Sequence, residues 1–180
     1  DWELIVVNKW NTIPDGYQTE LTTLSNGKQV DSRIYPALQD LFDAMRADGI
    51  YPIVREGYRT TTDQQSILDD KIKAYEQEGL SSLLAKKMAS EWVAAPGTSE
   101  HQLGIAVDIN ADKTKSTNDE VYTWLAEHAW EYGFILRYPK DKENVTGTGY
   151  EPWHYRYVGK EAAKEIWQES CCLEEYVTQN

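Results

Sequence analysis

The sequence of 180 residues has few cysteines, few basic residues and no long apolar run. Its two cysteines, Cys171 and Cys172, are neighbours in the chain, and adjacent cysteines are poorly placed for a structural disulfide. Without a disulfide framework, the cysteines say nothing about the cellular compartment. No window of about 18 or more apolar residues occurs, so the sequence predicts no membrane-spanning helix.

The sequence also has few positively charged residues for its number of acidic ones. The chain has 18 Lys and Arg against 30 Asp and Glu, which gives a net charge of −12. Affinity for nucleic acid comes mainly from Lys and Arg, so we expect no nucleic-acid partner. An anionic small substrate held by one local arginine stays compatible with this balance. We expect most of the acidic residues on solvated helix faces.

The composition predicts one folded domain over residues 1–180. Hydrophobic residues make up 41% of the chain and aromatic residues 12%, which is enough for a real core. No repeat, low-complexity run or linker interrupts the sequence, although residues 1–34 are expected to form an irregular N-terminal extension. Because the chain begins at Asp1 rather than at Met, we expect a leader or a membrane anchor before residue 1.

Hydrophobic periodicity predicts an α+β fold. Apolar residues at helical spacing after residue 35 end at Gly49, and the turn residue Gly133 ends a later helix. The predicted strands cluster in the second half of the chain, around the few histidines. Helices are predicted from 35 to Gly49 and over 63–77, 81–94, 118–131, 160–169 and 173–177, and strands over 4–7, 50–54, 104–109, 134–138 and 153–158.

Candidate chemistry lies near two of the three histidines. His101 precedes the alternating segment that carries Asp108, and His154 begins another alternating segment. Zinc prefers His nitrogen and carboxylate oxygen, and a catalytic site keeps three protein ligands with an open position. Asp108 lies among core residues, where a carboxylate is costly to bury unless it is paired or bound to a metal. Glu151, three residues before His154, is a candidate general base.

Each histidine alone is a weak signal. A single His beside aromatic residues is more often packed or exposed than a metal ligand, and His128 is expected to be an exposed helix residue. The His-Glu-x-x-His pattern of many zinc proteases is absent from the sequence. The metal hypothesis therefore depends on His101, Asp108 and His154 together.

Two motifs extend the argument by resemblance. Residues 99–108, SEHQLGIAVD, resemble the S-x-H-x-x-G-x-A-x-D motif of the D-alanyl-D-alanine metallopeptidases, and residues 151–154, EPWH, resemble their E-x-W-H motif. Together they resemble the VanY and VanXY branch, the bacterial D,D-carboxypeptidases of cell-wall metabolism and glycopeptide (vancomycin) resistance. The resemblance covers about residues 35–178. It implies a small antiparallel sheet that carries a zinc site and is flanked by helices, a fold shared with lysostaphin-type peptidases and the hedgehog domain.

Carried over by position, the resemblance implies a role for each motif residue. The zinc ligands would be His101, Asp108 and His154. Glu151 would be the general base, and Arg59 would stabilise the carbonyl oxygen as it gains negative charge. The residues implied in substrate binding are Gln64, Ser99 and Trp153.

Simpler readings of the last four residues stay open. Arg59 is equally read as the surface partner of Glu56 or Asp63, and Gln64 as an exposed helix residue. Ser99 is equally a turn or capping residue, and Trp153 an ordinary core residue.

The resulting prediction is a zinc-dependent D,D-carboxypeptidase that removes the terminal D-Ala from peptidoglycan precursor stems. Alternatives are a D,D-dipeptidase or bifunctional enzyme, an L,D-carboxypeptidase acting on tetrapeptide stems, a non-catalytic cell-wall-binding relative and a zinc-bearing structural or signalling domain. The first reading places the protein at the extracytoplasmic face of a bacterial envelope, and the dipeptidase reading places it in the cytoplasm.

Overall fold

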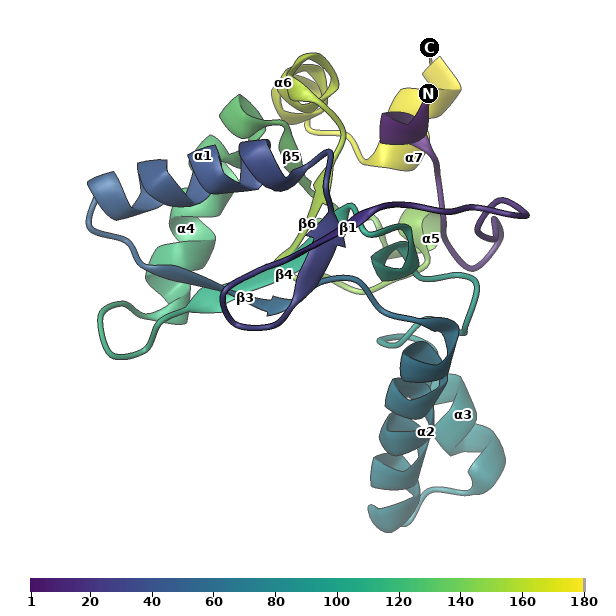
Figure 1. The fold of residues 1–180 in the computed structure, drawn as a ribbon. Coiled ribbons are helices and arrows are strands. Elements are labelled where there is room, and N and C mark those ends of the chain that lie inside the picture. Colours follow the sequence, from purple (N-terminus) through teal and green to yellow (C-terminus); the bar gives the residue numbers. More distant parts are fainter. Residues whose placement is uncertain (180) are drawn as a thin grey trace.

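The computed structural model describes residues 1–179 and confirms a mixed α+β chain (Figure 1). A four-stranded sheet lies at its centre, and a separate pair of short strands precedes the first helix. The elements in chain order are η1 (Trp2–Leu4), β1 (Leu21–Thr23), β2 (Gln29–Asp31), α1 (Tyr35–Ala47), β3 (Pro52–Glu56), α2 (Thr61–Gln77), α3 (Ser82–Ala89), η2 (Glu100–Leu103), β4 (Ala106–Ala111), α4 (Asn118–His128), η3 (Ala129–Tyr132), β5 (Phe134–Leu136), α5 (Glu143–Thr146), β6 (His154–Tyr157), α6 (Lys160–Glu169) and α7 (Leu173–Gln179).

The central sheet is antiparallel throughout, with strand order β3-β4-β6-β5. Strands β4 and β6 are its two inner strands, and their register sets Asp108 directly opposite His154. Because side chains alternate along a strand, these two residues share one face of the sheet. Val107 and Tyr155, the next pair, face the other way.

The main core covers the face of the sheet that carries Val107. Helices α1 and α4 lie together on one side of the sheet in Figure 1. Helix α1 buries a stripe of residues at helical spacing, which includes Leu41 and Met45, against that core. A smaller apolar cluster under α6 and α7 contains Ile166 and Leu173. Alternation along the strands therefore separates an apolar face from a polar one. Near the centre of the sheet, apolar side chains fill the face that carries Val107, and Asp108 and His154 lie on the other face.

Helices α2 and α3 form a hairpin that projects from the rest of the molecule (Figure 1). Helix α2 begins at a capping box, in which the side chains of Thr60 and Asp63 each accept a hydrogen bond from the other's backbone N–H. The hydroxyl of Ser81 caps α3 by accepting a hydrogen bond from the backbone N–H of Leu84. The base of this hairpin, not its tip, adjoins the central sheet.

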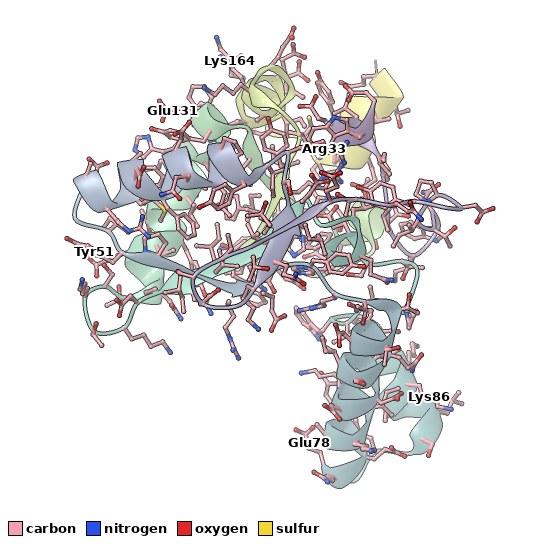
Figure 2. The ribbon with its side chains drawn as sticks, viewed as in Figure 1. Arg33, Tyr51, Glu78, Lys86, Glu131 and Lys164 are labelled. Atoms are coloured by element: carbon pink, nitrogen blue, oxygen red, sulfur yellow. The ribbon has the colours of Figure 1, made fainter. Side chains whose placement is uncertain are left out.

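Charged side chains point outward over the helices, as expected from the acidic composition (Figure 2). Glu78, Lys86, Glu131 and Lys164 are exposed examples on four different parts of the chain. Among residues 1–179, no helix is both long and apolar enough to cross a bilayer. Cys171 and Cys172 are both free thiols.

Local predictions differ from the structure at several places. The helix predicted over 81–94 ends at Ala89, and the one predicted over 118–131 ends at His128, where the 3-10 helix η3 follows. Residues 4–7 do not form a strand: η1 ends at Leu4, and Val7 is buried in the core without strand pairing. The segment 1–34 is largely irregular, but it contains the two three-residue strands β1 and β2. No helix is predicted between the strands at 134–138 and 153–158, but this segment contains the short helix α5.

Candidate metal centre and its cleft

The ligand atoms of His101, Asp108 and His154 converge at one end of the inner strands. They all lie within 4.8 Å of one another, and all three residues are buried. Asp108 comes from β4 and His154 from β6, while His101 comes from the 3-10 turn η2 that leads into β4. Gly104 ends that turn with φ of 82°, a left-handed conformation that glycine adopts without strain. The segment 101–108 therefore folds back so that the side chains of His101 and Asp108 meet.

The two imidazoles present different nitrogens to Asp108. Nε2 of His101 lies 3.3 Å from Oδ1 of Asp108, and Nδ1 of His154 lies 3.1 Å from the same oxygen. The opposite nitrogen of His101, Nδ1, lies 2.9 Å from the carbonyl oxygen of Gly57 and donates its hydrogen to it. The two rings meet edge to face, with centroids 4.8 Å apart.

This donor set fits a divalent cation such as zinc. Oδ1 of Asp108 is buried and accepts no well-formed hydrogen bond, although two ring nitrogens face it. Two nitrogens and one carboxylate oxygen are a usual ligand set for catalytic zinc. Burial alone lowers the pKa of His154, but the facing carboxylates of Asp108 and Glu100 outweigh it and raise the pKa to about 9. A cation at this point would take the place of that proton.

Glu151 lies beside the cluster rather than within it. Its Oε1 is 3.8 Å from Nδ1 of His154, and the residue is 8% exposed. The loop before β6 positions it, because its backbone N–H donates to the carbonyl oxygen of Tyr138. Burial raises the pKa of Glu151 to about 7, and the negative charge of Asp108 adds to the rise. A carboxylate with this pKa suits proton transfer near neutral pH.

Arg59 enters the cleft from the segment after β3. Its Nη2 lies 3.7 Å from Oδ2 of Asp108, and its Nε lies 3.4 Å from Glu56. Its Nη1 donates to Oε1 of Gln64 at 3.3 Å. Arg59 thus pairs with Glu56, one of the two partners in the simpler reading, whereas Asp63 bonds to Thr60 instead. The contact of Arg59 with a substrate oxygen stays a prediction.

The three residues implied in substrate binding all line the same chamber, which has a volume of about 140 Å³. Gln64 is buried rather than exposed, and its amide also donates to the carbonyl oxygen of Ala94 at 2.7 Å. Ser99 is buried, and its hydroxyl caps η2 by accepting from the N–H of His101. Trp153 is half-buried on the wall. Their direct contact with a substrate stays a prediction.

The structure adds chamber residues that sequence reasoning missed. Tyr138 packs against the ring of His154 with centroids 4.7 Å apart, and Trp92 reaches the chamber from the loop after α3 with 45% of its surface exposed. The remaining additions are Ile67, Val93, Ala94 and Thr148. His128 lies outside, as expected, on the exposed face of α4 beside Glu131.

An open groove of about 430 Å³ continues from the chamber. It shares four wall residues with the chamber, namely Arg59, Ile67, Asp108 and Trp153, and adds Arg55, Glu56, Asn110 and Tyr122. The hydroxyl of Tyr122 donates to Oδ1 of Asn110 at 2.6 Å, which fixes the groove floor over β4. The metal-ligand cluster thus faces a small chamber on one side and an open channel on the other.

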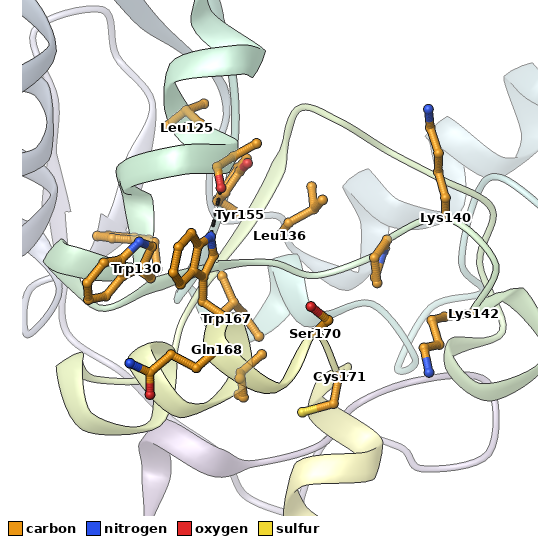
Figure 3. A pocket seen from close by; sticks show the side chains of 15 residues that line it. Leu125, Trp130, Leu136, Lys140, Lys142, Tyr155, Trp167, Gln168, Ser170 and Cys171 are labelled. Carbon is orange, nitrogen blue, oxygen red and sulfur yellow. Dashed lines mark hydrogen bonds between the residues drawn. The ribbon is translucent and has the colours of Figure 1, made fainter.

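A larger cavity, of about 670 Å³, is shown in Figure 3. It is lined by Tyr155, which lies on the face of the sheet opposite Asp108 and His154. Trp130 and Trp167 stack at its edge with centroids 5.0 Å apart, and Tyr155 lines its wall. No histidine or carboxylate is among its lining residues, whereas two of each line the smaller chamber. The chemistry of the described chain is concentrated in the smaller chamber.

Comparisons with known proteins identify the family of the chain. The family model described as VanY, D-alanyl-D-alanine carboxypeptidase, matches residues 27–160. A D-alanyl-D-alanine carboxypeptidase of Enterococcus faecalis is 59% identical over 98% of the chain, and the chain spans 66% of that relative's length.

Two solved structures are similarly close, each with a TM-score of 0.97 and 59% identity. One is the vancomycin-resistance D,D-pentapeptidase VanY from the VanB-type cassette in complex with Zn(II), matched over 98% of this chain and 99% of its own. The other is VanYB in complex with D-alanine-D-alanine, matched over 99% of this chain and 98% of its own.

Proposed function

Because the chain belongs to the VanY family of D-alanyl-D-alanine carboxypeptidases, we propose that it removes the terminal D-Ala from peptidoglycan stems ending in D-Ala-D-Ala. The observation that carries this proposal is the buried cluster of His101, Asp108 and His154 with Glu151 beside it. The close relatives bound to Zn(II) and to D-alanine-D-alanine support the same ion and the same substrate end.

In this proposal Nε2 of His101, the carboxylate of Asp108 and Nδ1 of His154 hold zinc. The ion supplies Lewis acidity, which acidifies a water and polarises the scissile carbonyl. The protein supplies the orientation of the rings, through the carbonyl oxygen of Gly57 behind His101 and the carboxylate of Glu100 behind His154.

Glu151 and Arg59 carry the proton and the charge of the reaction. The carboxylate of Glu151 takes a proton from the attacking water, whose oxygen forms a bond to the carbonyl carbon. We assign the negative charge that develops on the carbonyl oxygen to the Arg59 guanidinium, whose Nη2 lies 3.7 Å from Asp108. When the C–N bond breaks, Glu151 returns its proton to the leaving amine of D-Ala.

The shape of the cleft favours a carboxypeptidase over a dipeptidase. A chamber of about 140 Å³ suits a single small residue, which we assign as the terminal D-Ala. The open groove past Trp153 gives the rest of the stem a path away from the ligand cluster. A free dipeptide places its terminal residue in the chamber and leaves most of the groove unused, so it forgoes part of the binding surface.

Separate incubations with UDP-muramyl pentapeptide, UDP-muramyl tetrapeptide and D-Ala-D-Ala test the proposal, with released D-Ala as the readout. We expect release from the pentapeptide at a rate well above that from the dipeptide, and none from the tetrapeptide. Preference for the dipeptide would favour the dipeptidase reading, and preference for the tetrapeptide the L,D-carboxypeptidase reading. No release from any of them, with zinc bound, would favour a non-catalytic relative.

The substrate class sets the place of action that we propose. Stems ending in D-Ala-D-Ala belong to the bacterial cell wall, so we place the activity at the cell envelope, on its extracytoplasmic face. The vancomycin-resistance structure supports a role in glycopeptide resistance.

A further inference from the structure

A buried carboxylate lies directly behind one of the proposed metal ligands. Oε1 of Glu100 is 2.8 Å from Nε2 of His154, on the ring edge opposite the nitrogen that faces Asp108. Both side chains are almost completely buried. With its hydrogen on Nε2, His154 donates to Glu100 and turns the lone pair of Nδ1 toward Asp108. Glu100 thus sets both the tautomer and the orientation of this ring.

Two buried arginines hold the second oxygen of that carboxylate. Nε of Arg137 donates to Oε2 of Glu100 at 2.9 Å, and Nη1 of Arg156 donates to the same oxygen at 3.0 Å. Neither arginine is exposed to solvent. Arg156 is itself anchored, since its Nη2 donates to the carbonyl oxygen of Glu3 at 2.8 Å. The Glu100 side chain is therefore held in one conformation, which depends on the two arginines.

Arg137 connects this arrangement to the C-terminal helix. Its Nη1 and Nη2 donate to the two carboxylate oxygens of Glu174 in α7, each at 2.8 Å, a bidentate geometry. Asn8, from the N-terminal segment, donates to the same carboxylate at 3.0 Å. Two arginines and two glutamates make the cluster neutral, so removal of either carboxylate leaves an unbalanced buried charge.

We propose that Glu174, Arg137 and Glu100 form a positioning chain through which α7 tunes the metal affinity of His154 from outside the cleft. If Glu174 is neutralised, the Arg137 guanidinium has Glu100 as its only charged partner and draws that carboxylate more strongly. The hydrogen bond from His154 to Glu100 then weakens, and excess positive charge lies closer to the ligand cluster. Both effects disfavour a bound cation. The inference depends on the proposed ligand set.

A purely structural role makes a different prediction. Breaking a buried ion pair destabilises the fold, whatever the pair does for a neighbouring site. The free energy of unfolding therefore does not distinguish a structural role from a positioning role. The zinc affinity and the ligand geometry of the folded protein distinguish them.

The test is Glu174→Gln in the full chain, with Glu175→Ala as its matched control. Glu175 is the next residue of α7; it pairs with Lys142 at 3.0 Å and caps the helix start by accepting from the N–H of Cys172, also at 3.0 Å. The control therefore loosens α7 without removing a contact of Arg137. Zinc dissociation constants come from competition with a chromophoric chelator, and the visible spectrum of the Co(II)-loaded protein reports the ligand geometry.

We expect Glu174→Gln to raise the zinc dissociation constant about three- to tenfold and to shift the Co(II) bands, while Glu175→Ala changes neither. Glu100→Gln, one step closer to the ring, should raise the constant about 10- to 100-fold. Should Glu100→Gln fail to fold, Glu174→Gln still decides, because the Glu174 side chain is 12% exposed at the edge of the cluster.

Wild-type affinity and spectrum in Glu174→Gln would overturn the positioning chain. Equal weakening in Glu174→Gln and Glu175→Ala would overturn it too, because that result indicates a general loosening of α7. If the wild-type chain binds no zinc, the ligand set itself is wrong. If the wild-type chain binds zinc but releases no D-Ala, the proposed activity is wrong. The zinc dissociation constants of the variants still test the positioning chain in that case.

Discussion

Replacement of Glu151 by Gln tests the proposed reaction most directly. Gln keeps the shape of the side chain and removes its charge and its ability to accept a proton. Glu151 lies 3.8 Å from Nδ1 of His154, outside hydrogen-bond range and beside the ligand cluster. We therefore expect kcat/KM for D-Ala release to fall by about 10²–10⁴, with the zinc stoichiometry unchanged.

The pH dependence of the wild type follows from the same residue. Burial raises the pKa of Glu151 from 4.5 to about 7, and Asp108 contributes to the rise. A bound divalent cation favours the ionised carboxylate and works in the opposite direction. We expect kcat/KM to rise with pH along a limb of unit slope, with its midpoint between those two values. This limb should be absent from the residual activity of Glu151→Gln.

The raised pKa also has a cost for the fold. The folded chain binds the Glu151 proton more tightly than the unfolded chain does, so stability falls as the pH rises from 4.5 to about 7. In chelator-treated protein above that range, Glu151→Gln should be more stable than the wild type by up to about 3 kcal/mol. Below pH 4.5 the difference should vanish. Denaturant unfolding at the two extremes measures it.

Two results would refute this reasoning. Activity of Glu151→Gln above about a tenth of the wild-type kcat/KM would exclude Glu151 as the general base. Equal stability of the two chelator-treated proteins at alkaline pH would mean that the carboxylate is not held in a desolvated position.

Three further predictions concern the neighbouring groups. Arg59→Ala should lower kcat/KM for D-Ala release by about 10²–10³ while chelator competition shows unchanged zinc affinity, and weaker zinc binding instead would assign Arg59 to the metal site. Gly57→Ala would force a Cβ against the carbonyl of Gln29 and would move the Gly57 carbonyl oxygen that holds His101. The free energy of unfolding, measured with denaturant, should therefore fall by about 1–3 kcal/mol, and zinc should bind more weakly. Wild-type values of both quantities would contradict this. Removal of zinc by chelation should lower the melting temperature reversibly. A ligand at a thousandfold excess over its dissociation constant stabilises the folded state by about 4 kcal/mol. Identical melting curves with and without chelator would contradict a zinc site in the folded chain.

The sequence predicted the inner strands well because the signal there is local. Alternation along residues 104–109 placed Asp108 on the face opposite Val107, and the register confirms it. Residues 4–7 misled the same reasoning. Val7 is fully buried by the core without strand partners, and apolar composition alone does not distinguish these two states. Strands β1 and β2 have three residues each, too few for a periodic pattern.

The candidate site was predicted only as far as its motifs extend. Glu100 stood next to His101 in the sequence, but its role depends on Arg137 and Glu174, which lie 37 and 74 residues further along the chain. Trp92 comes to the chamber from the loop after α3, and neither spacing nor composition marks it. Such long-range placements follow from tertiary packing, which a single sequence does not display.

The pairing of Asp108 with His154 has a consequence for how the protein reaches its native state. If β4 and β6 slipped by one residue, Val107 could take the place of Asp108 opposite His154, or Tyr155 could take the place of His154 opposite Asp108. One metal ligand would then point to the wrong face of the sheet. Only the native alignment offers all three donors to an ion, so zinc would select that alignment among competing ones. Refolding in the presence of zinc should therefore give a higher yield of correctly paired sheet than refolding with chelator, independently of any catalytic turnover.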